Sequence, residues 1–151
     1  MKKQQGFTII ELIVVIVVLG ILAATAIPRF ANIGTEARIA SMQGVAGSIN
    51  SAREIIRAKW YAAGSTTATT VTTVDGQVID VASGTGSDAG FPAATTSGIE
   101  RAISISGNIG CVSAAGVTTC TPTGFALCTV TYTAATGAVS TAGLTTGNCG
   151  G

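Results

Sequence analysis

The chain has 151 residues, with Lys+Arg 8, Asp+Glu 7 and no His. Its hydrophobic share of 47% and low charge exclude intrinsic disorder, which needs the opposite balance. A formal net charge of +1 gives no electrostatic footprint for nucleic acid, and the lack of His excludes histidine triads and histidine metal sites. We therefore expect no specific nucleic-acid partner, no metal and no cofactor.

The hydrophobicity is concentrated in residues 7–27, FTIIELIVVIVVLGILAATAI. As a helix, about 21 residues span about 31 Å, close to the roughly 30 Å hydrocarbon core of a bilayer. A secretory signal peptide is the alternative, but its apolar region is shorter and ends at a small-residue cleavage site. Lys2 and Lys3 precede the run and keep that end cytoplasmic, so we expect the part after Pro28 to lie outside the cytoplasm.

An amphipathic helix is predicted after Pro28. Its apolar face recurs at spacings of three and four, at Met42, Val45, Ile49, Ala52, Ile56 and Trp60. Residues 7–61 would extend about 82 Å as a helix, and a small head covers only the second half. Lipid or other copies of the chain must bury the first half. Off the apolar face, Glu54 and Arg57 are expected to pair.

Gly20 and Pro28 interrupt the apolar half of this helical region. A proline inside a helix removes one backbone hydrogen bond and costs about 3 kcal/mol. Two interpretations stay open: a tolerated kink, or a segment built to lose helicity when the helix lengthens.

Residues 62–98 are rich in Thr, Ala, Ser and Gly and indicate a surface connector with one short strand near 77–81. Asp75, Asp80 and Asp88 lack calcium-loop spacing, so we interpret them as solvated loop carboxylates. From Ile99 the period of the hydrophobic pattern shortens to two residues, which predicts strands at 99–106, 125–133 and 139–144. The predicted fold class is α+β: a long N-terminal α-helix, half membrane-spanning and half amphipathic, packed on a small antiparallel β-sheet head.

The four cysteines all lie in the last third of the chain, at Cys111, Cys120, Cys128 and Cys149. Four cysteines allow three pairings, and we favour Cys111–Cys120, closing a short Gly- and Ala-rich loop, with Cys128–Cys149 tying back the tail. A metal site is the alternative, but no CxxC spacing and no His support it.

The sequence resembles the type IV pilin family. The resemblance rests on Gly6-Phe7-Thr8-Ile9-Ile10-Glu11 after a short basic leader, and on the apolar helix ending in Ala26-Ile27-Pro28-Arg29-Phe30. Residues 28–47 and the string Gly90-Phe91-Pro92-Ala93-Ala94 are similar to mannose-sensitive haemagglutinin-type pilins.

The resemblance implies a division into a cleaved leader (1–6), a hydrophobic filament-core helix (7–30), an amphipathic helix (31–61), a connector (62–98) and a disulfide-bonded sheet (99–151). A prepilin peptidase would cut between Gly6 and Phe7 and methylate the new Phe7 amine. Glu11 would serve assembly, and Gly20 and Pro28 match the positions that bracket a segment unwound in filaments.

The implied function is a structural subunit that polymerises with identical subunits into an extracellular pilus for adhesion or surface motility. Its partners would be membrane lipid before assembly, then the prepilin peptidase and the inner-membrane assembly machinery, with the head in the periplasm. A pseudopilin of a type II secretion system is the alternative. An anchored enzyme is disfavoured, because GxSxG and Gly-rich phosphate loops are absent.

Glu11 also has a physical interpretation that does not depend on the family. A carboxylate inside a membrane span costs about 2.5–3.5 kcal/mol and needs a partner. After cleavage, the cation at a matching depth is the Phe7 amine, either of the same chain or of a neighbouring parallel helix. In the second case the pair sets the axial register between helices.

Overall fold

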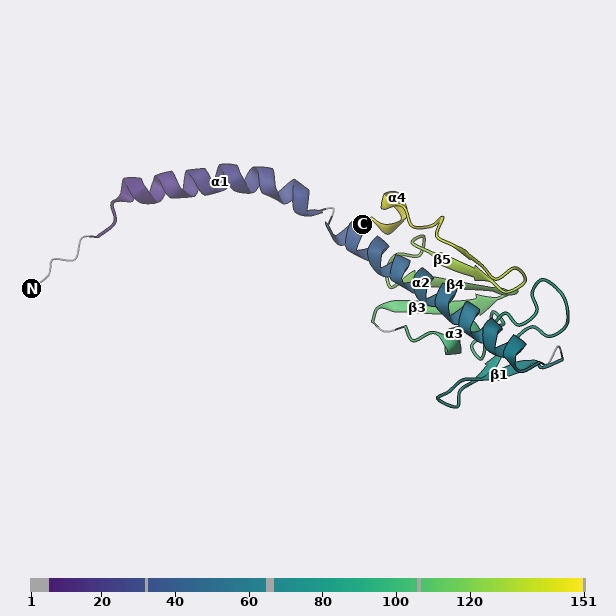
Figure 1. Ribbon diagram of the computed structural model, residues 1–151. Helices are drawn as coiled ribbons and strands as arrows, with labels where there is room; N and C mark the ends of the chain where they lie inside the picture. The colour runs from purple at the N-terminus through teal and green to yellow at the C-terminus, as the bar shows by residue number, and fades with distance from the viewer. Residues whose placement is uncertain (1–5, 32, 65–66, 106, 151) are drawn as a thin grey trace, which may run out of the picture.

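The computed structural model describes residues 6–31, 33–64, 67–105 and 107–150. The leader residues 1–5, with Lys2 and Lys3, lie outside this range. In chain order the elements are α1 (Ile9–Ala31), α2 (Ile33–Ala62), β1 (Thr70–Thr72), β2 (Val78–Asp80), α3 (Ile99–Ala102), β3 (Ile109–Ala114), β4 (Val117–Pro122), β5 (Val130–Thr133), β6 (Ala138–Ser140) and α4 (Thr146–Cys149). The expected α+β fold is confirmed: a long N-terminal helical region leads into a small antiparallel sheet (Figure 1).

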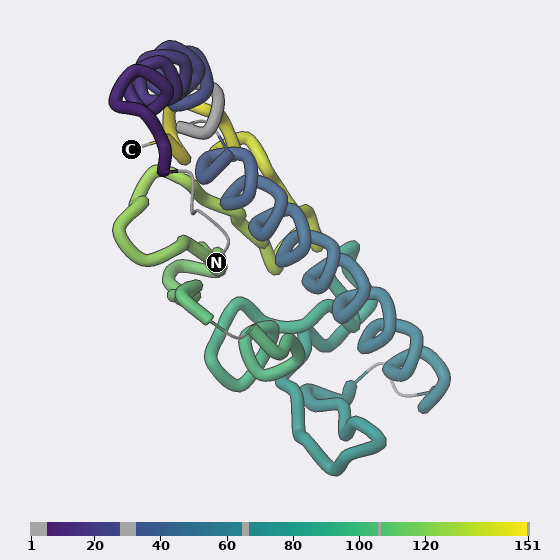
Figure 2. The backbone as a smooth tube through the Cα atoms, turned by 90° about the vertical axis from the view of Figure 1, so that its left-hand side faces the viewer, coloured from purple at the N-terminus to yellow at the C-terminus, as the bar shows by residue number. Residues whose placement is uncertain are grey.

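Helix α2 lies across the head and buries the predicted apolar face. Its buried residues are Met42, Val45, Ala46, Ile49, Ile56 and Trp60, so five of the six predicted positions are buried and Ala52 is half-buried. Figures 1 and 2 show α2 running along the sheet over most of its length, whereas α1 projects away from the head. The periodic apolar face therefore predicts correctly where the head attaches.

The main sheet is a four-stranded antiparallel meander in the order β3-β4-β5-β6. Its inner face carries Cys120, Val130 and Tyr132, which are fully buried and pack with α2 in one apolar cluster. A second, smaller sheet pairs β1 with β2 and belongs to another cluster around Trp60 and Ile79. Two apolar clusters along one helix thus hold the two ends of the head.

Three of the predicted strands are partly or wholly wrong. Residues 99–105 do not form a strand, and residue 106 lies outside the described range: α3 occupies Ile99–Ala102, and Ile99 and Ile103, four residues apart, are both buried. The strand predicted at 125–133 is confined to β5, because residues 125–128 form a turn in which the Cys128 N–H donates to the Phe125 carbonyl at 3.0 Å. The strand predicted at 139–144 ends at Ser140.

The strands that sequence reasoning missed are β1, β3 and β4. Strand β1 has only three residues, too few to show a period. In β3 and β4 the inner face includes Ser113 and Thr118 while Val112 and Val117 lie on the outer face, so hydrophobicity does not follow burial there. The short strand near 77–81 is confirmed as β2. Asp80 lies in β2 half-buried, and its carboxylate accepts from the Ser97 hydroxyl at 2.5 Å, so it is not a solvated loop residue.

Tyr132 links the main sheet to the connector. Its hydroxyl donates to the Pro92 carbonyl at 2.7 Å, and the side chain is fully buried. Burial raises the pKa of Tyr132 to about 12, because the phenolate has to form away from water. The hydrogen bond satisfies the one polar atom that the ring carries into the core.

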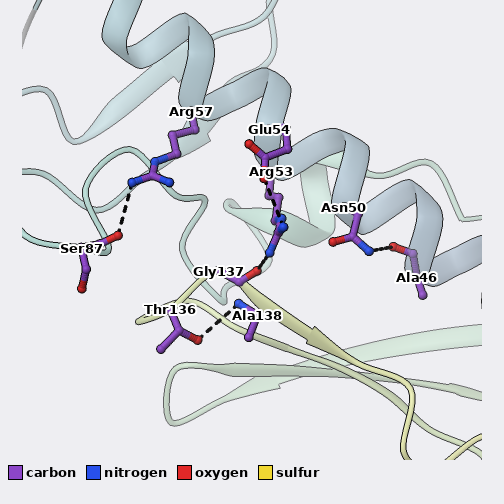
Figure 3. A network of polar contacts seen from close by, with 9 residues as sticks. All are labelled: Ala46, Asn50, Arg53, Glu54, Arg57, Ser87, Thr136, Gly137 and Ala138. Carbon is purple, nitrogen blue, oxygen red and sulfur yellow. Dashed lines mark hydrogen bonds and ion pairs between the residues drawn. The ribbon is translucent and has the colours of Figure 1, made fainter.

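Three arginines of α2 hold three separate segments of the head against the helix. The Arg38 guanidinium lies 3.8 Å from the centre of the Phe125 ring and donates to the Cys149 carbonyl at 2.7 Å. Figure 3 shows the other two: Arg53 donates to the Gly137 carbonyl, and Arg57 donates to the Ser87 carbonyl at 3.4 Å. These side chains therefore act in docking the head.

The predicted pair between Glu54 and Arg57 is wrong. Glu54 pairs instead with the adjacent Arg53 at 3.1 Å. Arg57 is drawn toward the head, where it stacks at 4.1 Å on the Phe91 ring. A guanidinium that contacts an aromatic ring and a carbonyl of the head contributes more to stability than one that forms an exposed ion pair on the helix.

Candidate assembly site

Residues Ile9–Ile27 of α1 present an apolar surface that no other part of the described chain covers. Residues Ile9–Ile27 form a stretch with mean hydropathy 2.9, long and apolar enough to cross a membrane, and none of it is buried in the subunit. Its large side chains keep about half or more of their surface exposed, such as Ile10 at 71% and Leu19 at 58%. A contiguous apolar surface of this size marks a membrane or protein contact.

The N-terminus of α1 is closed by a capping box made of Thr8 and Glu11. The Thr8 hydroxyl accepts from the Glu11 N–H at 3.3 Å, and one carboxylate oxygen of Glu11, Oε2, accepts from the Thr8 N–H at 2.9 Å. The Thr8 hydroxyl also donates to the same Oε2 at 2.7 Å. Both partners thus satisfy backbone donors that a helix start leaves unpaired.

The capping box fixes where the Glu11 carboxylate lies. Because Oε2 takes both bonds from Thr8, the carboxylate is held at the tip of the helix, where the helix dipole also favours a negative charge. The other oxygen, Oε1, meets no donor among the described residues. A carboxylate oxygen accepts up to two hydrogen bonds, so Oε1 retains its capacity to bind a cation or a donor from outside the subunit.

Sequence reasoning missed Thr8, although the pattern Thr-x-x-Glu before an apolar run is a signal for a capping box. It expected the own-chain partner of Glu11 to be the Phe7 amine. In the unprocessed chain that nitrogen is a peptide nitrogen, and Thr8 takes the partner's place.

Gly6 and Phe7 lie just before the helix and are not helical. The Phe7 side chain is 94% exposed. The peptide bond between them is therefore in an open, non-helical segment, as a peptidase needs for an extended substrate. The structure places this bond three residues from the start of α1 at Ile9, next to the capping box.

Gly20 and Pro28 both lie inside α1, which continues through each of them to Ala31. A Cβ at Gly20 would meet nothing within 4 Å, so packing within the subunit does not call for a glycine there. A glycine inside a helix costs about 1 kcal/mol relative to alanine, and a proline costs more. In the subunit the helix is thus intact but weakened at these two positions.

The four cysteines lie in the head, away from the apolar helix. Cys111 and Cys120 are register partners across β3 and β4, with Cα atoms 4.0 Å apart, and are joined by a disulfide. Cys128 is joined to Cys149, which ties the end of α4 to the turn before β5. This is the pairing that the spacing favours, except that the first bond staples two strands of a hairpin and not a loop.

A metal or catalytic site is not apparent in the described part of the chain. No group of three or more His, Cys, Asp or Glu side chains that could hold a metal occurs among the described residues. A groove of about 530 Å³ lies between α2 and the segment before β3, lined by residues such as Ser41, Met42, Ile105 and Pro122. Its lining is mostly apolar or hydroxyl-bearing and includes Arg38 and Asn108, but among the described residues it has no acidic side chain.

The comparisons with known proteins agree with the arrangement of the N-terminal region. The family model described as the prokaryotic N-terminal methylation motif matches residues 1–27. Over 53 residues the chain is 43% identical to the type IV narrow pilus major component PilA5 of Thermus thermophilus, a match covering 35% of this chain and 46% of that protein. No solved structure matches.

Two further relatives are similar over the same length. The chain is 39% identical over 51 residues to the type IV major fimbrial protein FimA of Dichelobacter nodosus, covering 34% of this chain and 33% of that protein. It is 37% identical over 54 residues to a fimbrial protein of Pseudomonas aeruginosa, covering 36% of this chain and 35% of that protein. The matches thus span less than half of each relative.

The capped glutamate and the exposed apolar stretch Ile9–Ile27 of α1 lie within the residues that match the N-terminal methylation motif. Over its N-terminal third, the chain is similar to type IV pilus and fimbrial proteins. The resemblance to mannose-sensitive haemagglutinin-type pilins stays a prediction.

Proposed function

We propose that this chain is a non-catalytic structural subunit that polymerises with identical copies, through α1, into an extracellular type IV pilus for adhesion or surface motility. The observation that carries the proposal is that none of Ile9–Ile27 of α1 is buried in the subunit, while one face of α2, next in the chain, is buried against the head. The relatives with pilus and fimbrial names favour a pilus over a secretion pseudopilin.

Before assembly, the subunit is anchored in the inner membrane. Lipid covers α1, residues 1–6 form the leader, and the head lies in the periplasm. A prepilin peptidase cuts the open peptide bond between Gly6 and Phe7 and methylates the new Phe7 amine. Cleavage removes Lys2 and Lys3, which hold the N-terminus at the cytoplasmic face, so the assembly machinery can draw the helix out of the bilayer.

Glu11 then sets the register between neighbouring subunits. Its Oε2 is engaged by Thr8, and its Oε1 is open to the Phe7 amine of an adjacent copy. The pair forms in an apolar core of packed α1 helices, where an unpaired carboxylate or amine costs several kcal/mol. Extension of the weakened segment between Gly20 and Pro28 lets neighbouring heads adjust their spacing along the filament.

The test is electron microscopy of cells that carry the wild-type gene, a deletion, or Gly6→Val. A β-branched residue at position 6 should block cleavage. It should leave α1 and the head unchanged, because a Cβ at Gly6 would meet nothing within 4 Å. Filaments should be present only in the wild type, while the Gly6→Val chain accumulates in the inner membrane with its leader attached. Filaments assembled from uncleaved Gly6→Val subunits would contradict the proposal.

A further inference from the structure

The outer face of the main sheet carries no charge. Every residue after Arg101 is uncharged, so the sheet strands β3 to β6 contain no Asp, Glu, Lys or Arg at all. The charged residues of the head come from α2, the connector and α3. Charged side chains are the usual means by which a sheet surface resists association, and this face lacks them.

The residues on this face follow from the register of the strands. One row crosses all four strands, from Val112 through Thr119 and Thr131 to Ser140. These side chains point away from the buried Cys120, Val130 and Tyr132, since neighbours along a strand alternate between faces. The flanking outer positions add Ala114, Val117, Thr121, Thr133 and Ala138.

The face is exposed, and its hydroxyls form few hydrogen bonds within the described part of the chain: the Ser140 hydroxyl accepts from the Ala142 N–H at 3.3 Å. Val112 is 71% exposed, and Ser140 is exposed at the other edge. Thr119 and Thr131, in the middle, are half-exposed and make no side-chain hydrogen bond among the described residues. The surface is therefore a flat array of β-branched methyl groups and hydroxyls over strands held rigid by the Cys111–Cys120 disulfide.

We propose that this face, defined by the row Val112–Thr119–Thr131–Ser140 and its flanking positions, binds the same face of a second copy in a neighbouring filament. This inference rests on the proposed function. A hydroxyl both donates and accepts, so the array is complementary to itself, as a two-fold contact between identical faces requires. Two copies meet without like-charge repulsion, whereas a charged partner would find no counter-charge on the face.

The face is too small to hold two single subunits together, so the contact needs the many copies that a filament presents. The strands have 6, 6, 4 and 3 residues, and at about 3.3 Å per residue and about 4.8 Å between strands they make a face of roughly 300 Å². A stable interface needs about 800 Å² per partner, so single subunits do not dimerise through this face. A filament repeats the face many times, and the repeated weak contacts add up to lateral bundling of filaments.

The test uses intact wild-type filaments and filaments of full-length Thr131→Lys and Thr131→Glu chains. Wild-type filaments should sediment as bundles at low speed, with little change between low and high salt, because no charge takes part. Each charged variant alone should form filaments in normal amount but lose bundling roughly tenfold, because many contacts repel at once. Mixing the two variants should restore bundling in low salt and not in high salt.

Thr70→Lys is the matched control, because Thr70 is an exposed threonine of a strand in the other sheet. It should leave bundling unchanged. Normal bundling by both Thr131 variants would overturn this inference alone and leave the proposed pilus intact. A loss of filaments in the Thr131 variants would also overturn it, because the face would then lie inside the filament. Absence of wild-type filaments would overturn the proposed function, and this inference with it.

Discussion

The two long helices of this chain differ in what covers their apolar residues. Helix α2 buries one face against two apolar clusters of its own head, whereas none of the spanning stretch of α1 is buried in the subunit. The helices follow one another in the chain, so the difference comes from side-chain pattern: one apolar face in α2, apolar residues all round in α1. A helix with a single apolar face can bury that face against one neighbouring element. A helix that is apolar on every side can bury its surface only if lipid or other helices surround it.

Loss of the Glu11 carboxylate is expected to have the largest effect. Glu11→Val removes the partner of the Phe7 amine from the filament core, at a cost of about 3–5 kcal/mol per contact, and should lower filament yield by at least tenfold. The head should fold normally, since within the described residues the Glu11 side chain hydrogen-bonds only to Thr8. Sheared filaments are quantified by immunoblot against total subunit.

Glu36→Val is the control for this prediction, because Glu36 is an exposed glutamate in the first turn of α2. It should leave filament yield unchanged. Equal yields from Glu11→Val and wild type would contradict the role of Glu11 in register.

A matched pair of isoleucine substitutions tests the contrast between the helices directly. Ile49→Ala empties a fully buried position and should lower the free energy of unfolding of the head by about 2–5 kcal/mol. Ile16→Ala, at a position 57% exposed, should leave head stability within about 0.5 kcal/mol of wild type. Denaturant unfolding of the full chain in detergent micelles, followed by near-UV circular dichroism, measures both. An equal loss from the two substitutions would mean that α1 packs on the head in solution.

Alkaline pH should destabilise the head and not α1. The pKa of Tyr132 is raised to about 12 in the folded chain and is about 10 when unfolded, so the stabilisation it gives is complete below pH 10 and is lost as the pH rises toward 12. The difference corresponds to about 2–3 kcal/mol. Thermal unfolding between pH 8 and 12 measures it, and Tyr132→Phe should flatten this part of the pH dependence. A wild-type melting temperature that stays constant to pH 12 would show that Tyr132 ionises freely.

The smallest effect is expected at the arginine that docks the end of the chain. Arg38→Lys keeps the charge but loses the planar stacking on Phe125, and should cost about 1 kcal/mol of head stability. Arg101→Lys, at an exposed position of α3, should cost close to nothing. The same denaturant measurement compares them, and equal values would show that the stack at Arg38 contributes nothing beyond its charge.

Local patterns in the sequence predict the helices better than the sheet. The face from Met42 to Trp60 is found because its hydrophobic residues repeat with the helical period, and the spanning segment is found by length and hydropathy. Strands β3 and β4 are missed because hydrophobicity does not follow burial there, and their inner residues are buried only through pairing across the sheet. Such pairing depends on residues far apart in the chain, which no local period reports.

In the candidate site, too, local sequence patterns predict some of the functional residues and miss others. Glu11, Gly20 and Pro28 stand out in the sequence, because polar or helix-breaking residues are costly in an apolar helix. The capping role of Thr8 was readable from its spacing to Glu11 but was overlooked. The contact between Arg38 and Phe125 could not be predicted from the sequence, because the two residues come together only when the sheet folds onto α2.

The position of the chain's end has a mechanical consequence. Figure 1 shows α4 beside the start of α2, where Arg38 donates to the Cys149 carbonyl and a disulfide joins Cys149 to Cys128. In a filament under tension, pulling force enters each head from α1 through the first turns of α2. The tail fastened there offers that load a covalent path through the disulfide to the turn before β5, in addition to the packing of α2 on the sheet.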